Sequence, residues 1–151
     1  MKSLKIYPVL SLLMMFGLVD SAMAHHSFSM FDRSREEVLA GKVVRWAFNS
    51  PHVALYLETE DGTLYGLEGA APAALLTRPP AMNGYTFTPG DVVKVVYCPL
   101  RDGHAGGAIG IIIPEDGMFY RPNDGGCAPN QKWDEWLMKG YTSKAQAESM
   151  E

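Results

Sequence analysis

Five short segments with the composition of β-strands, interrupted by one helix-like segment, constrain the fold of this chain most. β-Branched and aromatic residues between turn residues mark the strand segments, which are 37–48, 53–59, 63–69, 92–100 and 108–114. Residues 70–78 are rich in Ala and Leu, with Pro72 suited to a first helical turn. Three strands, a helix and two strands is the order of the five-stranded OB-fold, a Greek-key barrel. We therefore predict an all-β, OB-fold-like barrel with one short helix between strands 3 and 4; a small sandwich is the alternative.

The chain changes character after Tyr120. Trp133, Trp136 and Leu137 have the i, i+3, i+4 spacing of one apolar stripe on a short helix. We expect this C-terminal helix to pack on the barrel wall, and we expect no regular element in residues 143–151. The sequence thus predicts a barrel domain at 37–120 and a tail at 121–151.

The N-terminal residues have the pattern of a secretory signal peptide. Lys2 and Lys5 precede an apolar run at 6–19, and the small-residue site Ala22-Met23-Ala24 follows. The run is shorter than the roughly 20 residues that a membrane-spanning helix needs. We expect cleavage after Ala24, a periplasmic or secreted protein with no transmembrane segment after cleavage, and an N-terminal arm at 25–36. An uncleaved N-terminal anchor is the alternative.

Charge argues against one class of partner. The formal net charge is −4, whereas nucleic-acid binding requires a basic face. We therefore expect no nucleic-acid partner.

The two cysteines, Cys98 and Cys127, are expected to form one disulfide in an oxidising compartment. The enclosed loop of about 30 residues would contribute roughly 3 kcal/mol by loop entropy. Free thiols or soft metal ligands are the alternatives.

The four histidines are the candidate metal ligands. His25 and His26 follow the predicted cleavage site, and His52 and His104 lie in loops. In OB-folds the loops joining strands 1–2 and strands 4–5 flank the usual binding face. The fold prediction therefore brings His52 and His104 towards one end of the barrel.

Cleavage after Ala24 would create an α-amine that a metal can deprotonate near neutral pH. The amine and the imidazole of His25 can chelate one ion, completed by a further imidazole. Alternatively, the amine, the backbone amide nitrogen of His26 and its imidazole can wrap the ion. Nitrogen donors in a tetragonal arrangement favour Cu(II), so copper is the expected cofactor.

Geometry neither requires nor excludes this site. Strand 1 begins at the opposite end of an OB-fold from the loop that carries His52. Residues 27–36 could span up to ~33 Å when extended, but nothing in the sequence forces the arm to run back. The alternative is structural: a solvated N-terminal tail, a turn-capping His52 and an exposed His104.

Three further residues are candidate binding groups. Glu68 ends the third strand, and its carboxylate could be an internal acid, a metal ligand or a surface charge. Arg101 and Asp102 lie in the glycine-rich loop with His104, where a turn and a local ion pair are expected. No G-x-S-x-G nucleophile motif is present.

Several motifs together resemble a protein family. They are AHHSFSMFD after the signal segment, NSPHVALYLE after strand 1, GLEGAAPAALL before the helix, and PGDVVKVVYCPLRDGHAGGAIG. The combination is similar to domain-of-unknown-function family 6152, small exported bacterial proteins. His104 lies at a position that the family pattern does not fix. The family supplies no activity, so function rests on the residues.

The leading hypothesis is an exported, non-catalytic protein that binds a metal ion, copper first, for carriage or sequestration. The second is a binding module whose barrel face holds a small molecule, a glycan or a periplasmic partner protein. An oxidative copper enzyme is a third hypothesis, with no sequence support beyond the histidines.

Overall fold

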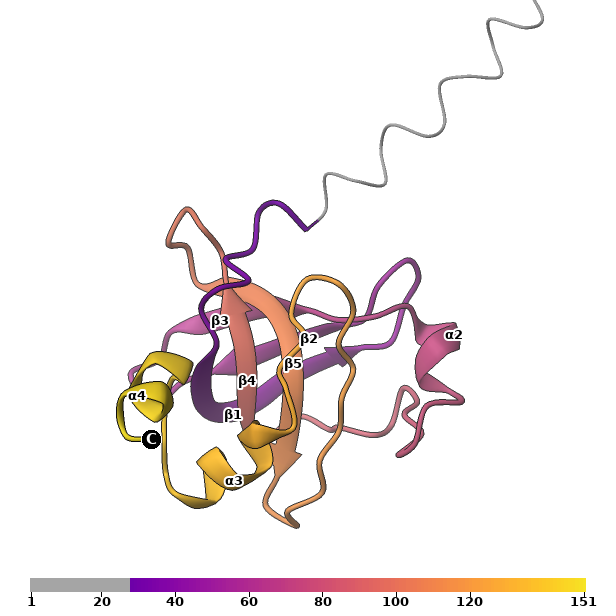
Figure 1. The fold of residues 1–151 in the computed structure, drawn as a ribbon. Coiled ribbons are helices and arrows are strands. Elements are labelled where there is room, and N and C mark those ends of the chain that lie inside the picture. The colour runs from indigo at the N-terminus through magenta and orange to yellow at the C-terminus, as the bar shows by residue number, and fades with distance from the viewer. Residues whose placement is uncertain (1–27) are drawn as a thin grey trace, which may run out of the picture.

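The computed structural model describes residues 28–151, and its core is a closed five-stranded barrel (Figure 1). The order around the barrel is β1-β2-β3-β5-β4. β1 pairs antiparallel with both β2 and β4, while β3 and β5 pair in parallel. The OB-fold-like prediction is confirmed. The strands are β1 (Glu37–Ala47), β2 (Ala54–Glu58), β3 (Leu64–Glu68), β4 (Val92–Pro99) and β5 (Gly106–Pro114).

The barrel interior is filled by alternate residues of each strand. In β2, Leu55 and Leu57 are fully buried, while Tyr56 between them lies on the outer face. Gly41 is required where β1 bends, because a Cβ there would lie 2.3 Å from the carbonyl oxygen of Glu58. This bend lets one long strand pair with neighbours on both sides.

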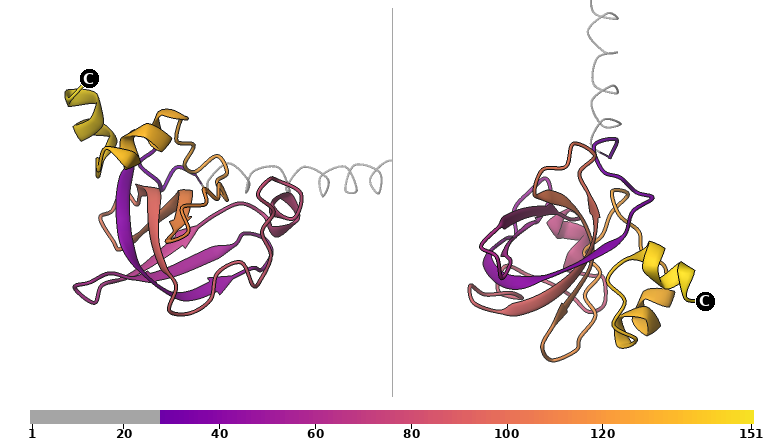
Figure 2. Two further views of the ribbon diagram at one scale, coloured as in Figure 1. Left: turned by 90° about the horizontal axis from the view of Figure 1, so that it is seen from below. Right: turned by 90° about the vertical axis from the view of Figure 1, so that its left-hand side faces the viewer.

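The described residues form three short helices outside the barrel wall: α2 (Pro72–Leu75), α3 (Lys132–Met138) and α4 (Lys144–Ser149). α2 stands between β3 and β4, as predicted. The apolar stripe of α3 buries Trp133 and Trp136 against outward-facing residues of β4 and β5, which confirms that this helix packs on the wall (Figure 2). Within residues 28–151, no helix is long and apolar enough to cross a bilayer.

The helix α4 corrects the expectation of an irregular C-terminus. The hydroxyl of Ser143 caps the helix by accepting from the backbone N–H of Gln146. Ala147 is fully buried, and Glu151 accepts from Lys132 of α3 at 2.8 Å. The burial of Ala147 and the bond to Lys132 are tertiary contacts, whereas the Ser143 cap is a local signal that the sequence analysis did not use.

Cys98 at the end of β4 forms the predicted disulfide with Cys127, with 5.4 Å between their Cα atoms. The two cysteines are buried in a small apolar cluster with Phe31 and Ala108. The bond therefore attaches the C-terminal tail to the barrel next to the N-terminal arm.

Candidate metal centre

The pairing of β2 with β3 brings His52 and Glu68 together. Ala54, the first residue of β2, is in register with Glu68, the last residue of β3. The pairing continues past the strands, because the backbone N–H of Val53 donates to the carbonyl of Ala70 at 3.0 Å. Val53 points inward, so His52 and Glu68 become diagonal neighbours on the outer face. Nδ1 of His52 contacts Oε1 of Glu68 directly.

Residues 121–127, here called the strap, bring a second carboxylate to this pair. The carbonyl of Pro122 accepts from the backbone N–H of Ala70 at 2.7 Å. At the other end of the strap, Cys127 is bonded to Cys98 of β4. Cys98 pairs with Ala108 of β5, and Ala108 pairs in turn with Glu68 of β3. The strap therefore crosses β5 close to the end of β3, and Asp124 lies within it.

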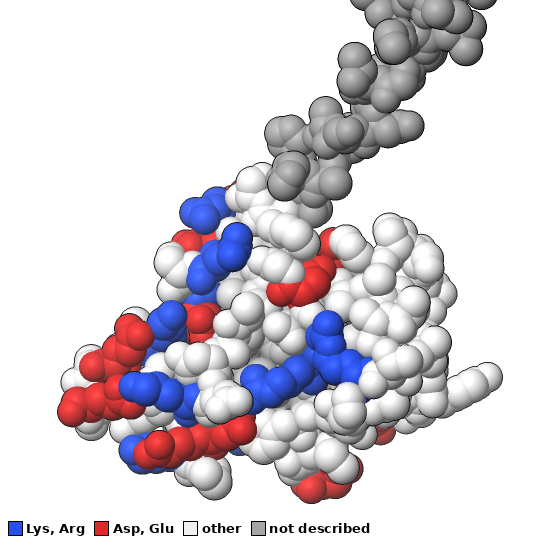
Figure 3. Space-filling model, turned by 45° about the vertical axis from the view of Figure 1, so that its right-hand side comes forward, with Lys and Arg blue, Asp and Glu red and all other residues white. Residues whose placement is uncertain are grey.

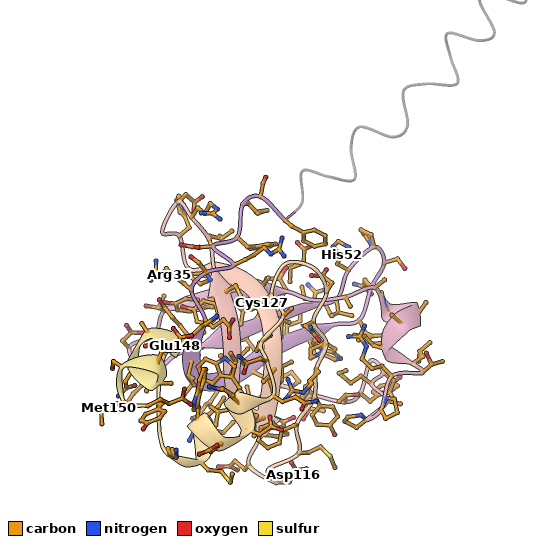
Figure 4. All side chains as sticks on the ribbon, viewed as in Figure 1. Arg35, His52, Asp116, Cys127, Glu148 and Met150 are labelled. Carbon is orange, nitrogen blue, oxygen red and sulfur yellow. A yellow bond between two sulfur atoms is a disulfide. The ribbon has the colours of Figure 1, made fainter. Side chains whose placement is uncertain are left out.

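His52, Glu68 and Asp124 each offer one ligand atom, and these three atoms lie within 4.8 Å of one another. The side chains of His52 and Glu68 remain 32% and 38% exposed, so the group is open to solvent. Both border a shallow depression of about 360 Å³, which Tyr56 also lines. Figure 4 shows His52 at the upper right of the barrel, on the side opposite Glu148 and Met150.

The donor chemistry fits a metal ion. Asp124 accepts the backbone N–H of Gly126 at 2.8 Å, a bond that orients the carboxylate while leaving it further acceptor capacity. One imidazole nitrogen and two carboxylate oxygens are common ligands of divalent transition metals. An ion bound by both residues would take the place of the direct contact between His52 and Glu68.

The structure does not place His104 with these residues. Nδ1 of His104 lies 3.1 Å from Oδ2 of Asp102, and its side chain is 82% exposed. The backbone N–H and the ring of His104 hold the pKa of Asp102 below its ordinary value. Figure 1 shows the β4–β5 hairpin, which carries both residues, apart from the β1–β2 loop that carries His52.

Arg101 does not form the expected local pair with Asp102. Its Nε donates to the carbonyl of Ser29 at 3.1 Å, and its backbone N–H donates to the carbonyl of Met30 at 2.9 Å. Its Nη1 lies 3.8 Å from Oδ1 of Asp32. Arg101 therefore holds the N-terminal arm against the loop that follows β4.

The described part of the arm lies beside the strap. A Cβ placed on Gly125 would lie 3.0 Å from the ring of Phe28, so the two residues pack closely. Gly125 follows Asp124 directly in the chain. His25 and His26 lie outside the described residues. Phe28, the first described residue of the arm, therefore lies against the strap residue that follows Asp124.

Asp124 is the residue that the sequence analysis missed. Its loop has no regular pattern, and it lies outside the motifs of the family resemblance. The available signal was Cys127, three residues further along, because the predicted disulfide places this loop beside the end of β4. Glu68 was identified as a candidate, with a metal ligand as one of three alternatives.

The fold and this group of residues define an OB-fold-like barrel with a His-Glu-Asp cluster on its outer wall. The family of unknown function DUF6152 matches residues 14–109, and the chain belongs to this family. The match includes His52 and Glu68 and ends before the strap that carries Asp124. No curated protein and no solved structure matches the chain.

Proposed function

We propose that this chain is an exported metal-binding protein that holds one divalent ion, preferentially Cu(II), at His52, Glu68 and Asp124. The observation that carries the proposal is the convergence of three ligand atoms, from three separate segments, within 4.8 Å. The site lies on an open surface, where an ion can pass to another ligand set. This position favours carriage or sequestration.

The preference for copper rests on the donor set. For a given site, affinity among divalent first-row metals is generally highest for Cu(II). One nitrogen and two oxygens leave coordination positions for further ligands. The proposed mature N-terminus supplies nitrogen ligands, through the α-amine and imidazole of His25 or through His26, and the resulting N,O set suits the tetragonal geometry of Cu(II).

The position of the arm supports this contribution. Phe28 packs on Gly125, next to Asp124. From Phe28 back to His26 the chain can span up to ~7 Å, which is enough to bring an imidazole to a neighbouring ion. The pattern of Lys2 and Lys5, apolar run and Ala22-Met23-Ala24 supports export and cleavage before His25.

The test is a Cu(II) titration of the protein comprising residues 25–151, with a chromophoric chelator as competitor. We expect one tight site, weakened about tenfold or more in each of His52→Ala, Glu68→Gln and Asp124→Asn. His104→Ala is the matched control, because that imidazole pairs with Asp102 on a different loop; its affinity should equal that of the wild type. Wild-type affinity in all three site variants would refute the proposal.

The contribution of the N-terminus is tested separately. A protein with one extra residue before His25 keeps both imidazoles and moves the α-amine. We expect fewer nitrogen couplings in its Cu(II) electron paramagnetic resonance spectrum than in that of the wild type. An unchanged spectrum would remove the amine from the ligand set and leave the three-residue site in place.

A further inference from the structure

We propose that Arg78 is a positioning residue of the metal centre, acting through the strap that presents Asp124. This inference rests on the proposed metal-binding function. Arg78 follows α2 in the chain and is distant in sequence from the strap. Its part-buried guanidinium is bonded to the strap backbone on the N-terminal side of Asp124.

The contacts of Arg78 are specific to the strap. Nη1 donates to the carbonyl of Arg121 at 2.9 Å and to the carbonyl of Asn123 at 2.8 Å, with the side-chain oxygen of Asn123 at 3.4 Å. Asn123 directly precedes Asp124, so this bond fixes the backbone one residue from the carboxylate. The disulfide of Cys127 fixes the strap three residues beyond Asp124. The ligand is thus held between two anchors.

If Arg78 acted through its charge, its removal would change metal affinity in the opposite direction from the change expected if it positions Asp124. A guanidinium near a metal centre repels the incoming cation, so removing its charge alone would tighten metal binding. Removing an anchor of Asp124 would instead weaken binding, because the carboxylate would no longer be held near His52 and Glu68. On the face drawn in Figure 3, basic and acidic side chains lie intermixed.

Arg45 provides a matched control for charge. Its guanidinium lies 5.9 Å from the ring centroid of Tyr56, and Tyr56 lines the depression that His52 and Glu68 border. Replacing Arg45 therefore removes a cation near the same centre without touching the strap.

The experiment measures Cu(II) affinity of residues 25–151 by chelator competition for the wild type, Arg78→Ala, Arg78→Lys, Arg45→Ala and Asp124→Asn. We expect Arg78→Ala to weaken binding about tenfold, in the range found for groups that orient metal ligands. Arg78→Lys should recover part of the loss, because an ammonium can still donate to a carbonyl. Arg45→Ala should bind as tightly as the wild type or tighter.

The decisive comparison places Arg78→Ala in the Asp124→Asn background. If Arg78 acts through Asp124, adding Arg78→Ala to Asp124→Asn should change Cu(II) affinity by less than about twofold. The Cu(II) electron paramagnetic resonance spectrum of Arg78→Ala should then resemble that of Asp124→Asn. Equal weakening in both backgrounds, or tighter binding in Arg78→Ala, would overturn the inference. If Arg78→Ala does not fold, Arg78→Lys in both backgrounds gives the same comparison. Absence of copper binding in the wild type would instead refute the proposed function.

Discussion

Replacement of Cys98 and Cys127 by alanine should weaken both the fold and the metal centre, and the two effects can be measured separately. The disulfide joins the end of β4 to the strap, and Cys127 lies three residues after Asp124. Both cysteines are buried, with relative exposures of 1% and 0%. Alanine fills the sites without adding a thiol that could itself bind copper.

The expected loss of stability follows from the loop that the bond closes. The sequence separation is 29 residues, for which the loop-entropy estimate gives about 3–4 kcal/mol. The loss of metal affinity has a different origin, since Asp124 would keep its anchor at Arg78 and lose the one at Cys127. We expect this loss to be about tenfold.

Stability is measured by urea unfolding, followed by the fluorescence of Trp133 and Trp136, which are buried between α3 and the barrel. Cu(II) affinity is measured without denaturant, where the variant is folded. Trp133→Phe serves as the control, because it destabilises the protein away from the strap. A folded double-alanine variant with wild-type affinity would refute the argument that the disulfide positions Asp124.

Three further predictions test the packing of the barrel, the strap and the C-terminal helix α3. Burial raises the pKa of Tyr97 to about 12, whereas an unfolded tyrosine titrates near pH 10. Because the unfolded state loses this proton first, the free energy of unfolding should fall as the pH rises from about 10 to 12. Urea unfolding midpoints measured over this pH range should fall less in Tyr97→Phe than in the wild type. A Cβ on Gly126 would lie 2.8 Å from the Cβ of Ala108. Gly126→Ala should therefore lower the free energy of unfolding by about 1–3 kcal/mol, measured by thermal unfolding, and should also weaken copper binding. Unchanged stability would contradict the packing described for the strap. Trp133→Phe removes the indole N–H that donates to the buried Glu36, which should cost about 1–3 kcal/mol with no change in copper affinity.

The barrel could be predicted from the sequence because its signals are local. Strand composition, turn residues and the helix after the third strand specify an order that few small folds share. The disulfide could also be predicted, because the chain has only two cysteines. The helix α4 was missed: Ser143 and Gln146 have the spacing of a helix cap, but a helix of this length also depends on tertiary contacts such as the burial of Ala147.

The metal centre could be predicted only in part. Glu68 ends β3 and His52 lies two residues before β2, so the register of these paired strands brings them together once the fold is known. Asp124 reaches them through the disulfide and the bonds from Arg78 and Ala70, which have no local signal. For the same reason, the sequence did not show that the arm lies beside the strap.

The most direct test of the central claim is a native intact mass of the protein purified from the periplasm after addition of one equivalent of Cu(II). The account predicts a chain that starts at His25, two hydrogens lighter than the reduced form, with one copper retained. The variant with His52→Ala, Glu68→Gln and Asp124→Asn combined should also start at His25 and keep its disulfide, with a chain mass lower only by the three substitutions, and should retain no copper. A wild-type chain starting at His25 without copper, or a combined variant that retains copper as the wild type does, would contradict the account.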